Sequence, residues 1–340
     1  MAERWKNRPE GSNWGDFGPD DEIGRLNLIT PERRLAAIAE VKEGIAFCLS
    51  LPLDLPGGTV LTPLRKPPVR GVEPRDANHD FVNFPMRLEN DHWDDISSDD
   101  YVTLYTQYST QWDAFSHVGR HFDADGDGEA EAVYYNGFRA GIDVVGPKDP
   151  GGPTAKRLGI EKMAETCVQG RGVLIDLNHY FGAERRLVNF DDLSRIMEKD
   201  NVVVETGDML CLHTGYSQGI MDMQGEPTEE LLHRQYPVLD GRDERVLDWI
   251  ERIGISVLIA DNFAVEGFPY EDMPEHAHYH GLPVHQKCLV DLGIHLGEIW
   301  YLTLLARHLR SRQRSRFLLT APPLRLPGSF GSPTTPVATV

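Results

Sequence analysis

The densest group of polar side chains in the sequence lies between Gln107 and His117. Within it, Asp113 and His117 are four residues apart, so a helical turn would bring both side chains to one face. A carboxylate beside an imidazole can hold a metal ion, or it can orient the imidazole as a general base. Solvated surface pairs have the same spacing, so this segment alone leaves catalysis and surface packing both open.

A second polar group lies far downstream, where Pro283 suits the first turn of a helix that would carry His285, and Glu298 follows. Imidazole nitrogen and carboxylate oxygen are donors that suit zinc or manganese. Upstream, Asp261, Asn262 and Glu266 follow an apolar run, in the position where ligand sites of α/β sheets tend to lie.

Alternating helices and buried strands must position these groups. Thr30 and Pro31 predict the start of a helix with Leu35, Ile38 and Val41 on its apolar face. Further helices are expected at 160–169, 191–199 and 246–253, and strands at 47–53, 101–108, 173–177, 209–212, 255–259 and 317–320. Residues 54–100 are expected to form a loop. The alternation predicts an α/β fold.

Composition excludes several classes of protein. The net charge of −19 over 340 residues opposes binding to nucleic acid and to anionic membrane surfaces. No apolar run reaches the roughly 18 residues of a membrane span, and Met1 to Lys6 do not resemble a secretory signal. The four cysteines are widely spaced, which favours buried free thiols in a reducing cytoplasm.

The chain also resembles the metal-dependent cyclase family, which includes bacterial kynurenine formamidases and isatin hydrolase. The family motif H-x-G-T-H-x-D-x-P-x-H can be laid on residues 107–117, and the resemblance extends over nearly the whole chain. It is carried further by the segments Gly18–Pro31, Tyr134–Gly137, Gly207–Leu210, Ala321–Arg325 and Gly331–Pro333. The resemblance implies a swivelling β/β/α fold, with a barrel-like strand core and outer helices, in a single domain spanning 1–340. It also implies a homodimer or homotetramer.

Roles for individual residues follow from the motif. Asp113 matches the metal-binding aspartate and His117 the histidine of proton transfer, while His285 and Glu298 match the downstream metal ligands. Gln107 and Gln111 stand where the family has its two metal-binding histidines. An amide oxygen is a weaker ligand than imidazole, so one zinc or manganese ion is expected to be weakly bound or absent.

The expected activity is hydrolysis of a small amide, lactam or lactone carbonyl. The alternative is a metal-independent member that catalyses acid–base dehydration or cyclisation, or that only binds a small molecule. In that case Gln107 and Gln111 would donate hydrogen bonds to a substrate carbonyl. Trp112, Phe115 and His121 are candidate substrate contacts.

Three other motifs permit rival interpretations. Residues 215–219 fit G-x-S-x-G, which would make Ser217 an esterase nucleophile with a later acid and histidine. Asp123, Asp125 and Asp127 are similar to half of a calcium loop, although the twelfth position is Tyr134. His276, His278 and His280 alternate and could share one face of a strand, but a loop is favoured there.

Overall fold

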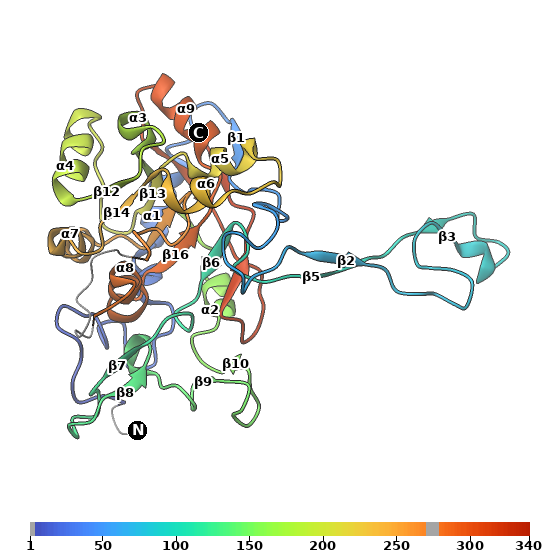
Figure 1. Ribbon diagram of the computed structural model, residues 1–340, viewed down its shortest axis with the longest axis horizontal. Coiled ribbons are helices and arrows are strands. Elements are labelled where there is room, and N and C mark those ends of the chain that lie inside the picture. Colours follow the sequence, from blue (N-terminus) through green and yellow to red (C-terminus); the bar gives the residue numbers. More distant parts are fainter. Residues whose placement is uncertain (1–3, 270–278) are drawn as a thin grey trace.

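A curled nine-stranded sheet forms the centre of the computed structural model, which describes residues 4–269 and 279–340 (Figure 1). The sheet order is β1 (Ala46–Cys48), β19 (Val337–Thr339), β17 (Arg316–Thr320), β11 (Gln169–Asp176), β13 (Met209–His213), β15 (Val257–Ala260), β16 (His295–Glu298), β6 (Gln111–Asp113) and β18 (Gly331–Pro333). Four neighbouring strands, β11, β13, β15 and β16, run parallel, and the strands on both sides of them are antiparallel. With helices around this sheet, the expected α/β class with a barrel-like strand core is confirmed.

Helices connect the parallel strands and cover the sheet. They are α1 (Pro31–Ile38), α2 (Ile160–Glu165), α3 (Asn178–Phe181), α4 (Phe190–Lys199), α5 (Tyr216–Asp222), α6 (Glu229–Arg234), α7 (Glu244–Ile253), α8 (Pro283–His285) and α9 (Thr303–Ser311). Asn189 caps α4 by accepting a hydrogen bond from the backbone of Asp192, and Asp243 caps α7 in the same way. Gly254 ends α7 in the left-handed conformation, as its position after the apolar pattern predicts.

The first helix differs from its predicted packing. It ends at Ile38, so Val41 lies outside it, and Leu35 and Ile38 are 67% and 50% exposed. Ala37 is the residue of α1 that is buried, and the helix contacts β11 and β17. A small side chain allows this close approach, which turns the larger apolar residues outward.

The segment between β1 and β6 contains more structure than the expected loop. Strand β2 (Val69–Gly71) pairs with β5 (Tyr101–Thr103), and β3 (Phe84–Pro85) pairs with β4 (Ile96–Ser97). The 3-10 turn η2 (Met86–Leu88) lies between β3 and β4. Together they form a ribbon that projects away from the body (Figure 1). The strand predicted at 101–108 therefore ends at Thr103, and turns lead from there to β6.

Three more strand pairs lie outside the main sheet: β7 (Arg120–Phe122) with β8 (Glu131–Val133), β9 (Val144–Val145) with β10 (Thr154–Ala155), and β12 (Arg186–Val188) with β14 (Pro237–Leu239). The remaining helical segments are η1 (Gly24–Leu28), η3 (Tyr135–Gly137) and the π-helix η4 (Gln286–Asp291). All four cysteines are free, but Cys48 and Cys167 are exposed, contrary to the expectation of buried thiols. Among the described helices, none has the length and apolar character to cross a membrane.

Candidate metal centre and active site

Two antiparallel strands, β6 and β16, supply most of the candidate site. Their register sets Gln111 opposite Glu298 and Asp113 opposite Leu296. Because side chains alternate along a strand, Gln111 and Asp113 share one face with Glu298, and Trp112 points to the other face. The predicted helical turn from Asp113 to His117 is therefore wrong at its start, which is a strand. The two side chains still meet, with His117 Nε2 3.8 Å from Asp113 Oδ1.

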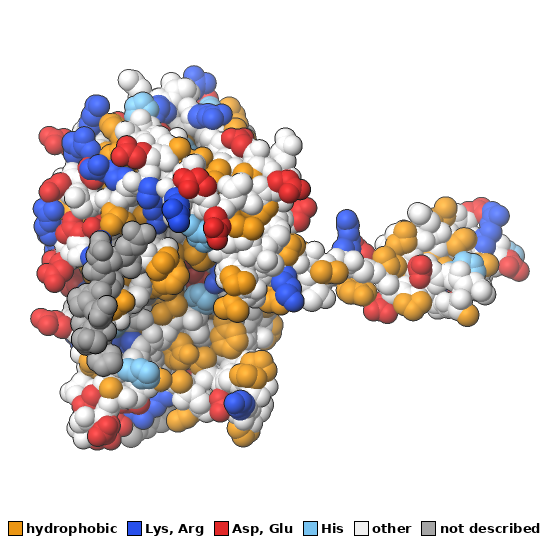
Figure 2. Space-filling view, in the orientation of Figure 1, with side chains coloured by type: hydrophobic (Ala, Val, Ile, Leu, Met, Phe, Trp, Pro, Cys, Tyr) orange, Lys and Arg blue, Asp and Glu red, His pale blue; other side chains and the backbone are white. Residues whose placement is uncertain are grey.

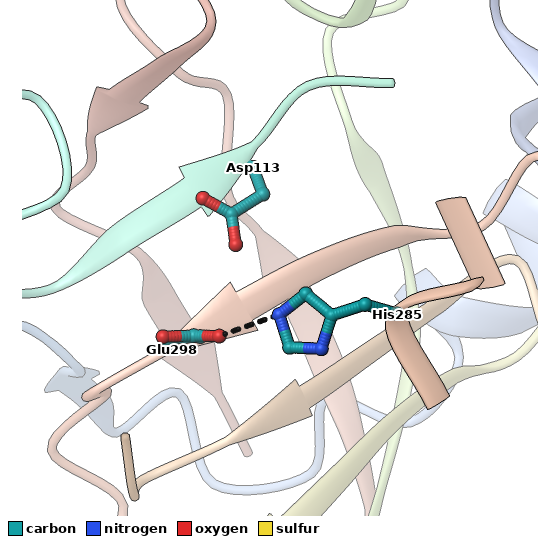
Figure 3. A group of neighbouring side chains, drawn as sticks. All are labelled: Asp113, His285 and Glu298. Atoms are coloured by element: carbon teal, nitrogen blue, oxygen red, sulfur yellow. Dashed lines mark hydrogen bonds and ion pairs between the residues drawn. The ribbon is translucent and has the colours of Figure 1, made fainter. Parts of the chain in front are cut away.

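Asp113, His285 and Glu298 converge from three different elements, β6, α8 and β16 (Figure 3). Each offers one ligand-type atom, and these three atoms lie within 4.8 Å of one another. All three residues are buried. Gln111 joins them, since its amide nitrogen donates to Asp113 Oδ1 at 3.2 Å and reaches Glu298 Oε2 at 3.5 Å.

Glu266 fixes the position of His285. One Glu266 carboxylate oxygen accepts hydrogen bonds from the backbone and from Nδ1 of His285, at 3.0 and 2.9 Å. The other accepts from the backbone of Val284 at 2.9 Å. With Nδ1 donating to Glu266, the ring directs Nε2 toward Glu298 Oε1, 3.2 Å away. This is the way in which carboxylates orient metal-binding histidines in proteins.

The charges of the cluster are strongly coupled. Burial raises the pKa of Asp113, an effect that His117 opposes and the Glu298 carboxylate reinforces. Burial acts against a charged imidazole, but the hydrogen bonds to Glu266 and Glu298 outweigh it and raise the pKa of His285 to about 10. Burial also acts to raise the pKa of Glu298, yet its hydrogen bond with His285 holds that pKa below its usual range. Without a cation, the cluster therefore favours a charged His285 between two carboxylates.

Several buried polar atoms at the cluster have no hydrogen-bond partner. They are Asp113 Oδ2, Gln111 Oε1 and Gln107 Nε2. Buried polar atoms in folded proteins are nearly always satisfied, so orphans at one place indicate a missing ligand, ion or water. Two of these three atoms are oxygens beside a carboxylate–imidazole pair, and this donor set fits a divalent cation.

His117 and Gln107 share a cavity whose lining does not include Asp113, His285 or Glu298. With Ser116, Tyr134, Val144 and Phe330, they line a cavity of about 550 Å³. The His117 side chain is 24% exposed, whereas that of Asp113 is fully buried. Of the Asp113–His117 pair, His117 is therefore the member that a molecule in this cavity can contact.

Arg65 is a residue of this region that the sequence analysis missed. Its guanidinium donates to the backbone oxygen of Gln107 at 2.7 Å. Its charge opposes the rise in the pKa of Asp113 and helps to hold the pKa of Glu298 below its usual range. It comes from the segment predicted to be a loop, 42 residues before Gln107, and no local pattern marks it.

Two of the three expected substrate contacts, Trp112 and Phe115, are buried in the core. Trp112 is fully buried on the opposite face of β6, where its ring meets Trp300 at 4.9 Å. Phe115 is also fully buried and stacks on His295 at 3.9 Å. These positions assign both aromatic residues to core packing. His121 is exposed on β7, opposite Ala132 of β8.

The G-x-S-x-G motif does not form a nucleophile elbow. Ser217 is the second residue of α5 rather than the turn residue after β13, and it is fully buried. Its hydroxyl reaches Asp261 Oδ2 at 3.3 Å, and Asp261 also accepts from the backbone of Thr214 and Gly215. Asp261 thus anchors the turn before α5, and the esterase interpretation lacks an accessible serine.

The acidic loop is arranged differently from the expectation. Asp123 and Asp125 approach Glu131, while Asp127 accepts a hydrogen bond from the backbone of Glu129 instead. Arg139 pairs with both Asp125 and Glu131 and supplies positive charge to the group. Of the three alternating histidines, His276 and His278 lie outside the described residues, and His280 is exposed.

Comparison with known proteins decides the family. The family model described as "Putative cyclase" matches residues 49–267. A crystal structure described as a novel cyclase is 32% identical and covers 97% of this chain and 99% of its own, with a TM-score of 0.76. The chain belongs to the cyclase family. The match to the family model includes Asp113, His117 and Glu266, and it ends before His285 and Glu298.

More distant members of the fold are also similar to this cyclase-family chain. Isatin hydrolase A from Labrenzia aggregata is 14% identical, with a TM-score of 0.53, over 92% of this chain and 99% of its own. Isatin hydrolase A from Ralstonia solanacearum is 14% identical, with a TM-score of 0.54, over 91% and 97%. At this identity the likeness shows a common fold. A search of the curated proteins found no match.

Proposed function

We propose that this protein is a hydrolase that opens a small amide, lactam or lactone carbonyl at the centre formed by Asp113, His285 and Glu298. The observation that supports this most strongly is the convergence of three buried ligand-type atoms within 4.8 Å, beside buried oxygens that have no partner. If these residues had only a structural role, their buried polar atoms would be paired, because each unpaired atom costs about 1–3 kcal/mol.

The three residues would hold one divalent cation, with zinc or manganese favoured by the nitrogen and oxygen donors. When bound, such a cation supplies polarisation of a carbonyl and of a water molecule. Gln111 offers only an amide oxygen where the family motif has a histidine, which supports weaker binding than in relatives with both histidines. Glu266 would keep Nδ1 of His285 protonated, so that Nε2 faces the cation.

His117 and Gln107 are suited to act on the substrate. His117 lies at the cavity edge next to Asp113, where it can take a proton from water and deliver it to a leaving nitrogen or oxygen. The Gln107 amide nitrogen is buried without a partner, so it can donate a hydrogen bond to the substrate carbonyl oxygen.

The substrate class is suggested by the relatives. Two of the structures that share the fold are named isatin hydrolases, and isatin is a cyclic amide. We extend to this chain only the class of a small carbonyl compound, because the low sequence identity to these structures establishes a common fold but not a common substrate. The free thiols are compatible with a reducing cytoplasm, which we propose as the compartment.

A metal-independent enzyme or binder is the second candidate. One observation favours it: Nε2 of His285 lies 3.2 Å from Oε1 of Glu298, so the two groups can satisfy each other with a direct hydrogen bond. Elemental analysis of protein purified without added metal separates the two candidates. A stoichiometric transition metal, with lactam or lactone hydrolysis lost in chelator and restored by manganese or zinc, supports the metal-dependent hydrolase. Hydrolysis that resists chelation in metal-free protein would overturn it.

A further inference from the structure

A second group of polar side chains lies at the carboxyl ends of the parallel strands. Asp176 is the last residue of β11 and His213 is the last residue of β13, just as Glu298 ends β16. The helices that follow β11 and β16, which are α3 and α9, lie beside these strand ends (Figure 1). Ligand sites of α/β sheets tend to form at this edge, so the second group is a candidate for one.

The group lines a cavity of about 370 Å³. Residues of α3, α5 and α9 enclose this cavity, together with the chain just before β14. Its volume falls in the range of sites for small molecules, which is roughly 300–1,000 Å³. Among the described residues, its lining shares no member with the candidate metal centre or with the cavity of His117. It is therefore a separate cavity.

The most deeply buried polar groups of the lining are already paired. His213 lies with Nδ1 2.8 Å from Asp176 Oδ1 and with Nε2 3.2 Å from Thr303 Oγ1. The other Asp176 oxygen accepts a hydrogen bond from the Arg310 guanidinium at 2.9 Å. Each oxygen of this carboxylate therefore has a partner, and the neighbouring positive charge reduces its repulsion of an incoming anion.

Three further side chains of the lining can donate hydrogen bonds and have no hydrogen-bond partner within the described part of the chain. They are the Arg307 guanidinium on α9, the His179 ring on α3 and the Tyr236 hydroxyl before β14. The backbone of Tyr236 is left-handed, with φ 65°, which is uncommon for a bulky residue. Such conformations concentrate at functional sites, so this one agrees with a ligand at the cavity.

The lining is positively charged, although the whole chain has a net charge of −19. It contains two arginines and one aspartate, which give a net charge of +1 with neutral histidines. Four of the five arginines between 307 and 316 pair with carboxylates, and these are Arg310, Arg312, Arg314 and Arg316. Arg307 has no ion pair among the described residues. Figure 2 shows more Lys and Arg side chains over the upper part of the body, where α3, α4 and α9 lie in Figure 1, than over its lower part.

We propose that this cavity binds a small organic anion through a carboxylate group. The planar guanidinium of Arg307 can donate two parallel hydrogen bonds to a carboxylate, and Tyr236 and His179 supply further donors. One negative charge neutralises the lining, which favours a monocarboxylate over a phosphate dianion. The binding site does not depend on which reaction takes place at Asp113.

Calorimetric titration of benzoate into the metal-free full-length protein tests the chemical class of the ligand. Metal is removed because a bound cation would offer carboxylates a second site. Wild type is expected to bind benzoate with a Kd below about 1 mM, and to bind neutral benzamide at least about tenfold more weakly. Inorganic phosphate should also bind more weakly than benzoate. Absence of benzoate binding, or binding of benzamide or phosphate as tight as that of benzoate, would overturn the proposal.

Two substitutions test whether the anion binds in this cavity. Arg307→Gln removes the unpaired charge and should weaken benzoate binding by about tenfold or more, and Tyr236→Phe removes the hydroxyl and should weaken it by about threefold or more. Neither group has a polar partner within the described chain, so both variants should keep Tm within about 2 °C of wild type.

The matched control is Arg252→Gln on α7. Arg252 is exposed, donates to the backbone oxygen of Asp248 and has no ion pair among the described residues. Its replacement changes the net charge by the same amount as Arg307→Gln, and it should leave the Kd for benzoate at the wild-type value. If either Arg307→Gln or Tyr236→Phe binds benzoate as tightly as this control, the anion binds elsewhere and the proposal is wrong.

Discussion

Replacement of Asp113 by asparagine should have opposite effects on the metal-free and the metal-loaded protein. In the metal-free protein, Asp113 is a fully buried carboxylate next to Glu298, and its Oδ2 has no partner. Asparagine keeps Oδ1 as the acceptor for Gln111, and its amide can donate toward Glu298. Removal of one unsatisfied, like-charged oxygen should stabilise the metal-free fold by about 1–2 kcal/mol, which raises Tm by about 1–3 °C in a chain of this length.

The same substitution should remove most of the stabilisation by metal. At a free metal concentration of about 100 times Kd, wild type gains about 2.7 kcal/mol. Asparagine removes one of the two anionic ligands, so the stabilisation by metal should fall to a small fraction of the wild-type value. The assay is calorimetric unfolding in EDTA and in manganese or zinc, for wild type and Asp113→Asn.

Asp261→Asn is a matched control for this experiment. Asp261 is as deeply buried as Asp113, but it accepts hydrogen bonds from Thr214, Gly215 and Ser217. Its replacement should lower Tm in EDTA and leave the metal-induced shift intact. The reasoning is refuted if Asp113→Asn lowers Tm in EDTA as the control does, or if metal stabilises it as much as wild type.

Four further substitutions probe the site. Gln111→His supplies an imidazole near Asp113 and should lower the metal Kd by about tenfold or more, measured by calorimetric titration; an unchanged Kd would show that position 111 does not face the metal. His117→Ala should reduce kcat by about 10²–10⁴-fold with metal content unchanged, and wild-type turnover would contradict its role. Burial lowers the pKa of His295 to about 3, so the folded protein binds fewer protons than the unfolded chain below pH 6.5 and loses stability as pH falls toward 3. His295→Phe should reduce the change of the unfolding free energy with pH between pH 6.5 and 4, measured by urea unfolding. An unaltered slope would show that other residues cause the loss of stability. Ser217→Ala should retain turnover, whereas an inactive but folded variant would revive the esterase interpretation.

The strands of the core were predictable because their apolar runs are continuous. Residues 173–177, 209–212 and 255–259 all fall within or overlap β11, β13 and β15. The convergence of Asp113, His285 and Glu298 was predictable only through the family motif. No spacing in the sequence indicates that Asp113 and Glu298 lie on adjacent strands, since their pairing depends on the register of distant segments.

Other features depended on tertiary structure. Trp112 is next to Asp113 in sequence, but strand alternation turns it to the opposite face of β6, where it packs in the core. Phe115 follows the end of β6 and packs on His295 and Tyr135 in a different part of the core. Arg65 meets the backbone of Gln107 across the base of the projecting ribbon, although 42 residues separate the two in sequence. The ribbon formed by β2–β5 and β3–β4 was expected to be a loop, since its strands are two or three residues long and the segments between them are rich in Pro, Asp and Asn.

The position of β6 in the sheet has a consequence for synthesis of the protein. Both neighbours of this strand, β16 and β18, come from the last 46 residues of the chain, although β6 itself begins at Gln111. While the chain is still being made, β6 emerges from the ribosome long before either edge can be paired. The nascent protein must keep this strand unpaired until Glu298 is available, so any metal enters at the end of folding rather than guiding its beginning.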